Sequence, residues 1–256
     1  MFQSINGRLF NIVCVGAGAP LLLVGGWIGS WQLWRQPMEI LSTHRRCVAY
    51  DHRGAGQTAA ELQDLHAEGL VDDVFRLLDA LKIDRCWLAG ESQGGLIAIL
   101  AAARDPSRFA GLTLISTGAV FLRTPERDTF AEMLQKDPAT VLRRFVAVCI
   151  PEPDSDHLRR WLFHILSEAL PAAGAALIHQ MYGVDVRDHL GRVSLPTQII
   201  HGEADRIESP DGARELAHGI DHAELLLLPG VGHVPTITRP ELVAQAMASF
   251  MDRNWQ

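Results

Sequence analysis

The sequence has few cysteines and no two of them at the short spacing of a metal or redox motif. The four residues are Cys14, Cys47, Cys86 and Cys149, and the first three lie inside apolar runs. We therefore expect buried free thiols in a reducing compartment and no disulfide framework. The eleven histidines also form no pair with metal-ligand spacing, so the sequence predicts no metal site.

The chain also lacks a basic stripe and a long apolar run. Its formal net charge is −7, with Lys and Arg scattered along the sequence, which argues against a nucleic-acid partner. No segment approaches the roughly 20 apolar residues of a membrane span. Residues 1–8 have neither the basic nor the apolar region of a signal peptide. We expect a cytoplasmic protein that binds neither nucleic acid nor a membrane.

Short apolar runs that alternate with longer amphipathic segments are present along most of the chain. This alternation is typical of βαβ units and a parallel sheet. Two strands joined at Asn6-Gly7, a dipeptide suited to a tight hairpin, predict an antiparallel N-terminal edge. The strands are expected at residues 2–5, 9–15, 21–24, 47–50, 86–89, 112–115, 197–200 and 225–228. The helices, on both faces of the sheet, are expected at 31–41, 71–81, 96–104, 210–218 and 240–251.

One connection, from residue 116 to residue 196, is too long for a simple crossover between neighbouring strands. Apolar spacing within it predicts helices at 127–134, 139–147, 156–170 and 172–182. We interpret this segment as a helical cap. The expected division is an α/β core of residues 1–119 and 194–256, with the cap at 120–193 as an insertion.

The strongest chemical motif is the segment from Gly90 to Gly94, which reads G-x-S-x-G between a buried strand and an Ala- and Leu-rich helix. Small residues on both sides suit the sharp turn that presents a nucleophilic serine, here Ser92. The helix that follows offers free N–H groups to a developing oxyanion. A Gly-rich structural turn is the alternative, but the strand and helix on either side favour a nucleophile.

A serine nucleophile needs a general base, and His233 lies in a Gly-rich loop directly after the last apolar run. Parallel strands end at one edge of the sheet, so this loop can approach Ser92. The acid that orients the histidine is expected in the turn after residues 197–200, where Asp205 gives the chain order Ser, Asp, His. Glu203 and Glu208 are alternatives for that role.

The loop after the first parallel strand contains Gly25, Gly26 and Trp27. Its position predicts that the N–H groups of Trp27 and Gln93 form an oxyanion hole. Glu91 is assigned no chemistry. An apolar substrate pocket is expected from residues that the loop, the strand ends and the cap bring above the serine: Gly26, Trp31, Phe121, Leu122, Trp161, Phe163 and Met181.

Taken together, these motifs resemble the α/β-hydrolase superfamily over almost the whole chain. The similarity is to small capped bacterial esterases and lactonases, such as 3-oxoadipate enol-lactonase and carrier-protein methyl-ester esterases. It includes the D-x-R-G-x-G turn at residues 51–56, the segment 202–205, and Gly232-His233. The resemblance implies the triad Ser92, Asp205 and His233, with Trp27 and Gln93 as oxyanion donors. The chain departs from the family at Gly25, where a histidine is usual.

The expected activity is hydrolysis of a carboxylic ester or lactone of a fairly hydrophobic small molecule through an acyl-enzyme, without a cofactor. The same triad also serves perhydrolysis, thioester hydrolysis, acyl transfer and carbon–carbon bond hydrolysis. A ligand receptor with slow turnover on a hydrolase scaffold is a further alternative. The sequence does not choose between a monomer and a homodimer.

Overall fold

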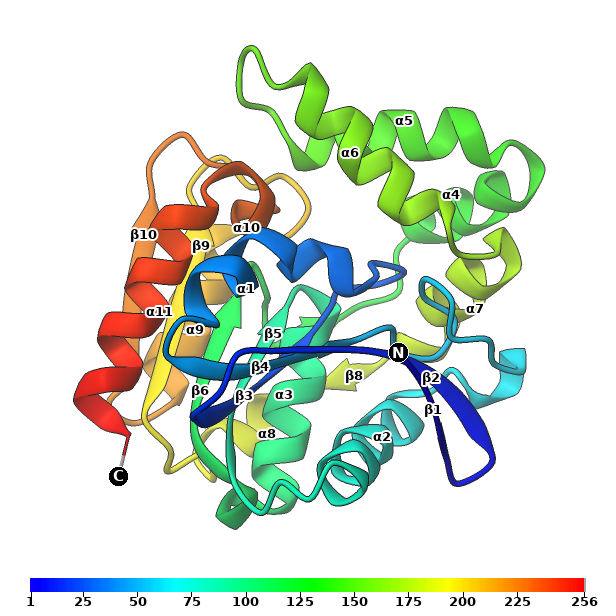
Figure 1. The fold of residues 1–256 in the computed structure, drawn as a ribbon. Coiled ribbons are helices and arrows are strands. Elements are labelled where there is room, and N and C mark those ends of the chain that lie inside the picture. Colours follow the sequence, from blue (N-terminus) through cyan, green and yellow to red (C-terminus); the bar gives the residue numbers. More distant parts are fainter. Residues whose placement is uncertain (256) are drawn as a thin grey trace.

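The computed structural model describes residues 1–255 and places an eight-stranded sheet at its centre (Figure 1). The strand order is β1-β2-β4-β3-β5-β6-β9-β10. The bounds are β1 (Phe2–Ile5), β2 (Arg8–Val15), β3 (Ala19–Val24), β4 (Arg45–Tyr50), β5 (Cys86–Glu91), β6 (Phe109–Ile115), β9 (Thr197–Gly202) and β10 (Glu224–Leu228). Strands β1 and β2 pair antiparallel, β2 and β4 likewise, and the others are parallel. The predicted sheet with an antiparallel edge is confirmed.

Helices cover both faces of this sheet, as predicted (Figure 1). One group consists of the 3₁₀ turn η1 (Trp31–Trp34) with α1 (Arg35–Leu41) and α11 (Pro240–Asn254), where α1 packs on α11. The other group contains α2 (Ala67–Ala80), α3 (Gln93–Arg104), α8 (Arg187–Leu190) and α9 (Pro210–Gly219). The central strands β5 and β6 are buried at every residue because both of their faces are covered.

The long connection between β6 and β9 contains the four predicted helices. They are α4 (Pro125–Lys136), α5 (Pro138–Cys149), α6 (Asp156–Ser167) and α7 (Pro171–Met181), here called the cap helices. Figure 1 shows α4, α5 and α6 beyond one end of the sheet. Strands β7 (Val120–Phe121) and β8 (Val184–Asp185) pair antiparallel at the base of the segment. The sequence analysis missed this pair, because two residues carry no readable period.

Prolines and polar N-caps determine where the cap helices begin. Proline is near the start of α4, α5 and α7, where its missing N–H is not needed. The hydroxyl of Thr124 accepts a hydrogen bond from the N–H of Arg127, and the carboxylate of Asp137 accepts one from Thr140. Helix α6 ends at Ser167, short of the predicted end at Leu170.

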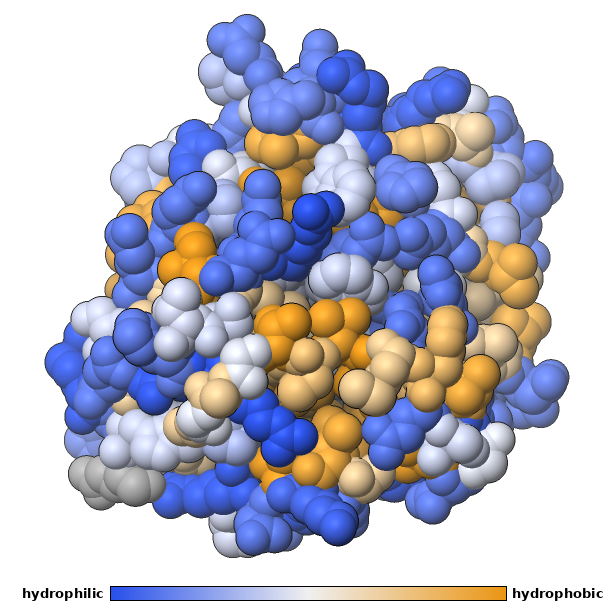
Figure 2. Space-filling model, viewed as in Figure 1, coloured by the Kyte–Doolittle hydropathy of each residue, from blue (hydrophilic) through white to orange (hydrophobic). Residues whose placement is uncertain are grey.

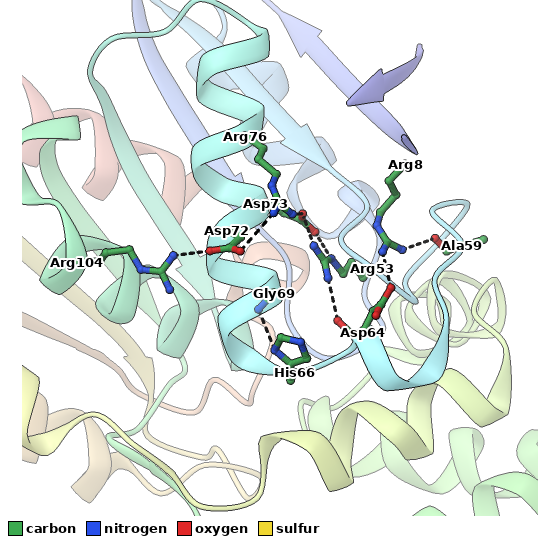
Figure 3. Close-up of polar contacts among 10 residues, drawn as sticks. All are labelled: Arg8, Arg53, Ala59, Asp64, His66, Gly69, Asp72, Asp73, Arg76 and Arg104. Carbon is green, nitrogen blue, oxygen red and sulfur yellow. Dashed lines mark hydrogen bonds and ion pairs between the residues drawn. The ribbon is translucent and has the colours of Figure 1, made fainter. Parts of the chain in front are cut away.

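A buried ion pair fixes the turn at residues 51–56, which follows β4 (Figure 3). The guanidinium of Arg53 donates from Nε and Nη2 to the two carboxylate oxygens of Asp73 on α2, at 2.5 and 2.7 Å. The neighbouring Asp51 carboxylate accepts hydrogen bonds from the N–H groups of Trp31 and Gln57. The turn therefore ties α2 to the loop that follows β3, and that loop reaches the site described below.

All four cysteines are free thiols. Cys47, Cys86 and Cys149 are buried, as predicted, whereas Cys14 is only partly buried. Within residues 1–255, no cluster of three or more His, Cys, Asp or Glu side chains could hold a metal ion. In the same range, no single helix is long and apolar enough to cross a membrane, although α6 and α7, bent by 86°, together pass that test on length and composition.

Candidate active site

Ser92 lies in a sharp turn between β5 and α3, with φ 54° and ψ −122°. Left-handed backbone of this kind is costly for a residue with a side chain and is typical of functional turns. The flanking glycines make it sterically feasible. A Cβ on Gly90 would collide with the carbonyl of Gly94, and a Cβ on Gly94 would lie 2.6 Å from the oxygen of Gly25. The turn therefore presses against the end of β3.

The structure brings the three side chains singled out in the sequence to one edge of the sheet. The Nε2 atom of His233 is 3.0 Å from the Oγ of Ser92, and its Nδ1 atom is 2.8 Å from Oδ2 of Asp205. Asp205 follows β9, while His233 lies between β10 and α10 (Pro235–Thr238). With the proton on Nδ1 directed at the carboxylate, Nε2 can accept the proton of the hydroxyl.

The loop that carries His233 is held from the cap side. The backbone N–H of His233 donates to the carbonyl of Cys149 at 2.8 Å, and the N–H of Gly232 donates to Oε1 of Glu152 at 3.1 Å. A Cβ on Gly232 would collide with Pro151 and the Cys149 carbonyl. Gly232 thus permits the close approach between the loop and the end of α5, which fixes the position of the imidazole.

The Asp205 carboxylate is buried and fully engaged. Its Oδ1 accepts hydrogen bonds from the N–H groups of Ile207 and Glu208, at 2.8 and 3.0 Å. A second imidazole, that of His201 on β9, places Nε2 3.2 Å from Oδ2. Burial alone would raise the pKa of Asp205, but His233 and His201 hold it well below its usual range. The carboxylate is therefore ionised throughout the neutral pH range.

The other acids in this turn do not contact the imidazole of His233. The side chain of Glu203 is exposed, and that of Glu208 lies 3.3 Å from Nη2 of Arg127 on α4. The sequence analysis missed His201, which directly follows the strand predicted at residues 197–200 and gave no signal beyond its spacing of four residues from Asp205.

The loop after β3 meets the serine turn at very short range. A Cβ on Gly26 would lie 2.9 Å from the Cβ of Ser92 and 3.0 Å from the carbonyl oxygen of Glu91. Trp27 has a φ of 21°, and its indole Nε1 donates to the carbonyl of Gly174 on α7 at 2.9 Å. Gln93 is the first residue of α3, where backbone N–H groups have no acceptor within the helix.

His52 supplies an imidazole next to the loop after β3, where the sequence has Gly25. It is buried, and its Nδ1 lies 2.9 Å from the carbonyl of Arg53. Burial lowers the pKa of His52, against the opposing effect of the backbone nearby. The buried imidazole from the turn after β4 and Gly25 of this loop line the same small cavity.

Two cavities meet at Ser92, and both reach the cap helices. The larger has a volume of about 260 Å³ and the smaller of about 40 Å³. The larger is lined by Trp27, Ser92, Gln93, Phe121, Glu126, Arg127, Phe130, Phe145, Ile178, Arg206, Ile207 and Glu208. The smaller is lined by Gly26, Trp27, Gly29, Leu33, Glu91, Ser92, Phe145, Cys149, Leu162, Leu166, His233 and Val234.

Of the residues expected to line the substrate pocket, Gly26 and Phe121 do line these cavities. The other five lie outside both. Leu122 is 60% exposed, Met181 is fully buried in the core, and Trp31 is fixed in the loop after β3. The rings of Trp161 and Phe163 lie under the guanidinium groups of Arg35 and Arg143. The expectation was wrong for these five. For Trp161, Phe163 and Met181 the reason is that apolar spacing does not tell which face of a cap helix turns toward the serine. Trp31 and Leu122 lie outside the cap helices, in η1 and between β7 and α4.

Other cap residues take the expected positions around the serine. Phe130 on α4 and Phe145 on α5 pack against the indole of Trp27, with ring centroids 5.4 and 5.2 Å away. Arg127 and Glu208 close one side of the larger cavity, where they form an ion pair between α4 and the turn after β9. Phe130 and Phe145 each lie in a helix that the sequence predicted. Which way their rings point depends on tertiary packing.

Comparison with known proteins gives consistent results. A family model described as alpha/beta hydrolase fold matches residues 19–172. The chain is 30% identical to a pimeloyl-[acyl-carrier protein] methyl ester esterase of Nitrosospira multiformis, over 89% of this chain and 92% of the relative. It is 25% identical to 3-oxoadipate enol-lactonase 2 of Acinetobacter baylyi, over 93% and 90%. A thermophilic esterase from Thermogutta terrifontis superimposes with a TM-score of 0.91 at 26% identity, covering 100% of this chain and 97% of that one.

Proposed function

The chain belongs to the alpha/beta hydrolase fold family, and from this premise we propose that it is a serine hydrolase of carboxylic esters or lactones. The observation that carries the proposal is the continuous contact from Ser92 through His233 to Asp205, with separations of 3.0 and 2.8 Å. An unassisted hydroxyl is a weak nucleophile, whereas one hydrogen-bonded to a neutral imidazole can lose its proton as it attacks.

In the proposed mechanism, His233 accepts the proton of Ser92 while the serine Oγ attacks the ester carbonyl. The tetrahedral intermediate collapses as the bond to the alcohol oxygen breaks, and His233 returns the proton to that oxygen. A water molecule then gives a proton to His233 as it attacks the acyl carbonyl. The bond from the acyl carbon to the Oγ of Ser92 breaks, His233 returns the proton to that oxygen, and the acid is released. Asp205 keeps the imidazole oriented and stabilises its protonated form.

The backbone N–H groups of Trp27 and Gln93 are proposed to hold the oxyanion. Both residues line the larger cavity together with Ser92. Gln93 also begins a helix whose N-terminal dipole favours negative charge. The close approach at Gly26 supports the role of the loop, because a bulkier residue there would force it away from the serine.

The proposed substrates are small and fairly hydrophobic. Relatives named as a methyl ester esterase and an enol-lactonase support an ester or lactone, and the aromatic lining of the larger cavity supports an apolar group. We also propose that residues 120–193 form the cap over a core of residues 1–119 and 194–256. A cytoplasmic location is part of this proposal.

The proposal is tested with a panel of p-nitrophenyl esters and lactones, together with a fluorophosphonate label. Ser92→Ala should lower kcat/KM by on the order of 10⁴-fold or more and abolish labelling. Ser167→Ala, on the exposed side of α6, is the matched control and should retain both. Retention of most activity by Ser92→Ala would contradict the proposal. Labelling of Ser92 without turnover of any panel member would contradict it too, and would favour a receptor.

A further inference from the structure

A third hollow lies between the cap helices α4 and α5, and the mechanism above does not use it. It has a volume of about 490 Å³, and most of the residues that line it are apolar. They include Met133 on α4, and Val141 and Val148 on α5. Met133 and Val148 are 42% and 40% exposed, so this hollow, here called the cap groove, is open to solvent.

The cap groove adjoins the larger cavity at Ser92. Glu126, Phe130, Phe145 and Ile207 line both spaces. These four residues come from α4, α5 and the turn after β9, so three separate elements form the common boundary. The side chains at this boundary decide whether a substrate chain can pass from the cavity into the groove.

The side chain of Phe145 extends from the cap groove to the cavities at Ser92. Val141 and Val148, four residues before Phe145 and three after it, line the groove and neither cavity. Residues at this spacing share one face of a helix, so the side chain of Phe145 leaves α5 on the groove side. Its ring centroid is nevertheless 5.2 Å from that of Trp27, which lines both cavities. The ring of Phe145 therefore lies between the groove and the serine.

Phe130 takes the equivalent position on α4. Met133, three residues further along the helix, lines the cap groove and neither cavity at Ser92. The ring centroid of Phe130 is 5.4 Å from that of Trp27 and 5.3 Å from that of Phe145. Aromatic rings at these separations are in packing contact. The two phenylalanine rings thus form a partition between the larger cavity and the cap groove.

We propose that Phe130 and Phe145 are specificity-determining residues, whose rings close the larger cavity and limit the length of the substrate chain that lies in it. The inference rests on the proposed function, because it concerns the same ester-cleaving site. A cavity of about 150 Å³ binds one benzene molecule, so the larger cavity, of about 260 Å³, holds a group of about ten non-hydrogen atoms. The preferred substrates are thus esters with a short apolar chain in the acid or the alcohol portion. Two arms of the experiment distinguish these portions.

The experiment compares kcat/KM for a six-carbon and a twelve-carbon chain in two pairs of esters, with the released acid titrated. The acid-side pair is methyl hexanoate and methyl dodecanoate, and the alcohol-side pair is hexyl acetate and dodecyl acetate. The pair that wild-type protein hydrolyses faster identifies the portion that lies in the larger cavity. Within that pair, wild-type protein should prefer the six-carbon member by at least about tenfold, because the longer chain meets a space that is already filled.

Two substitutions remove the partition. Phe145→Ala and Phe130→Ala each join the larger cavity to the cap groove, where the far end of a twelve-carbon chain can bury its methylene groups against apolar side chains. Each variant should lower the six-carbon preference by at least about tenfold. Phe163→Ala is the matched control, because Phe163 lies on the cap helix α6 and lines neither the groove nor the two cavities. It should keep the wild-type preference. Circular dichroism and fluorophosphonate labelling of each variant show that the fold and the serine are intact.

A smaller preference in wild-type protein would overturn the inference. A preference that neither Phe145→Ala nor Phe130→Ala lowers by this factor would also overturn it, as would an equal change in Phe163→Ala. Hydrolysis of p-nitrophenyl acetate but of neither six-carbon ester would overturn it as well, and all of these results leave the proposed function in place. Failure of the proposed function is distinct: wild-type protein would then hydrolyse no ester, or Ser92→Ala would hydrolyse them as fast as wild type, and the inference would fall with it.

Discussion

At the scale of single residues, the surroundings of His233 set the pH range in which it can act as a base. Burial on its own would lower its pKa, but the carboxylate of Asp205, followed by those of Glu208 and Glu91, raises it above the ordinary value of 6.5. Of the groups that raise the pKa, Asp205 has the largest effect, because it accepts a hydrogen bond directly from the imidazole. The same contact that orients the imidazole therefore makes it more basic.

A pH profile of kcat/KM follows from this arrangement. The base must be neutral, so activity should fall as the pH drops through a midpoint above 6.5. Asp205→Asn should move this midpoint down, because the attraction to the protonated imidazole is lost. It should also lower kcat by less than Ser92→Ala does. Asp211→Asn, an exposed acid at the start of α9, is the control and should leave the midpoint in place. A midpoint that stays the same or rises in Asp205→Asn would contradict this assignment.

At the scale of elements, the serine turn depends on how closely β5, α3 and the loop after β3 approach one another. Gly90 and Gly94 leave no room for a Cβ, because backbone carbonyls lie where it would be. These carbonyls belong to the backbone, so they cannot shift to admit a Cβ as easily as the end of a flexible side chain could. The geometry of the site thus depends on small residues that take no part in the chemistry.

Substitution at Gly90 tests this dependence. Gly90→Ala should lower the free energy of unfolding by roughly 1–3 kcal/mol, the usual effect of overpacking. It should also slow fluorophosphonate labelling by on the order of 100-fold, since a shift of about 1 Å at the nucleophile has that effect. Gly191→Ala is the control, because Gly191 has a φ of −65° and no atom within 4 Å of an added Cβ. It should be neutral or slightly stabilising. Equal urea-unfolding midpoints for the two variants would contradict the steric argument.

At the scale of the whole molecule, the fold was largely predictable because each strand and core helix carries its own period and its own turn residues. The meeting of the three side chains was predictable for a topological reason: Ser92, Asp205 and His233 each follow a parallel strand, and such strands end at one edge. The residues that line the cavities could not be predicted in this way. Which face of each cap helix turns toward Ser92 depends on contacts with residues distant in sequence. The position of His201 beside Asp205 is likewise visible only when the chain is folded.

At the same scale, the ion pair between Arg53 and Asp73 ties the turn at residues 51–56 to α2 (Figure 3). Side chains of Arg53 and Asp73 are only 7% and 2% exposed. Arg53→Met would leave the Asp73 carboxylate buried without its main partner and should lower the free energy of unfolding by about 3–5 kcal/mol. The control is Arg35→Met, in a pair with Glu39 that is 54% and 63% exposed. Arg35→Met should lower the free energy of unfolding by less than about 1 kcal/mol. If urea unfolding showed that Arg53→Met and Arg35→Met lower the free energy of unfolding by similar amounts, the prediction would be contradicted.

The surface seen in Figure 2 is mixed, with apolar residues among charged ones. Several of the exposed apolar residues belong to the N-terminal hairpin, including Met1, Phe2 and Leu9. They lie on a different part of the chain from the residues that line the two cavities at Ser92. The proposed chemistry therefore involves the two cavities at Ser92 and not this exposed surface.

The most direct test of the account is to trap the covalent intermediate. Wild-type protein mixed with p-nitrophenyl acetate, quenched in acid within milliseconds and digested, should yield one acetylated peptide by mass spectrometry, with the acetyl group on Ser92. Ser92→Ala should yield no such adduct and no burst of p-nitrophenol. An acetyl group on another residue during turnover, or hydrolysis by Ser92→Ala at the wild-type rate, would contradict the central claim.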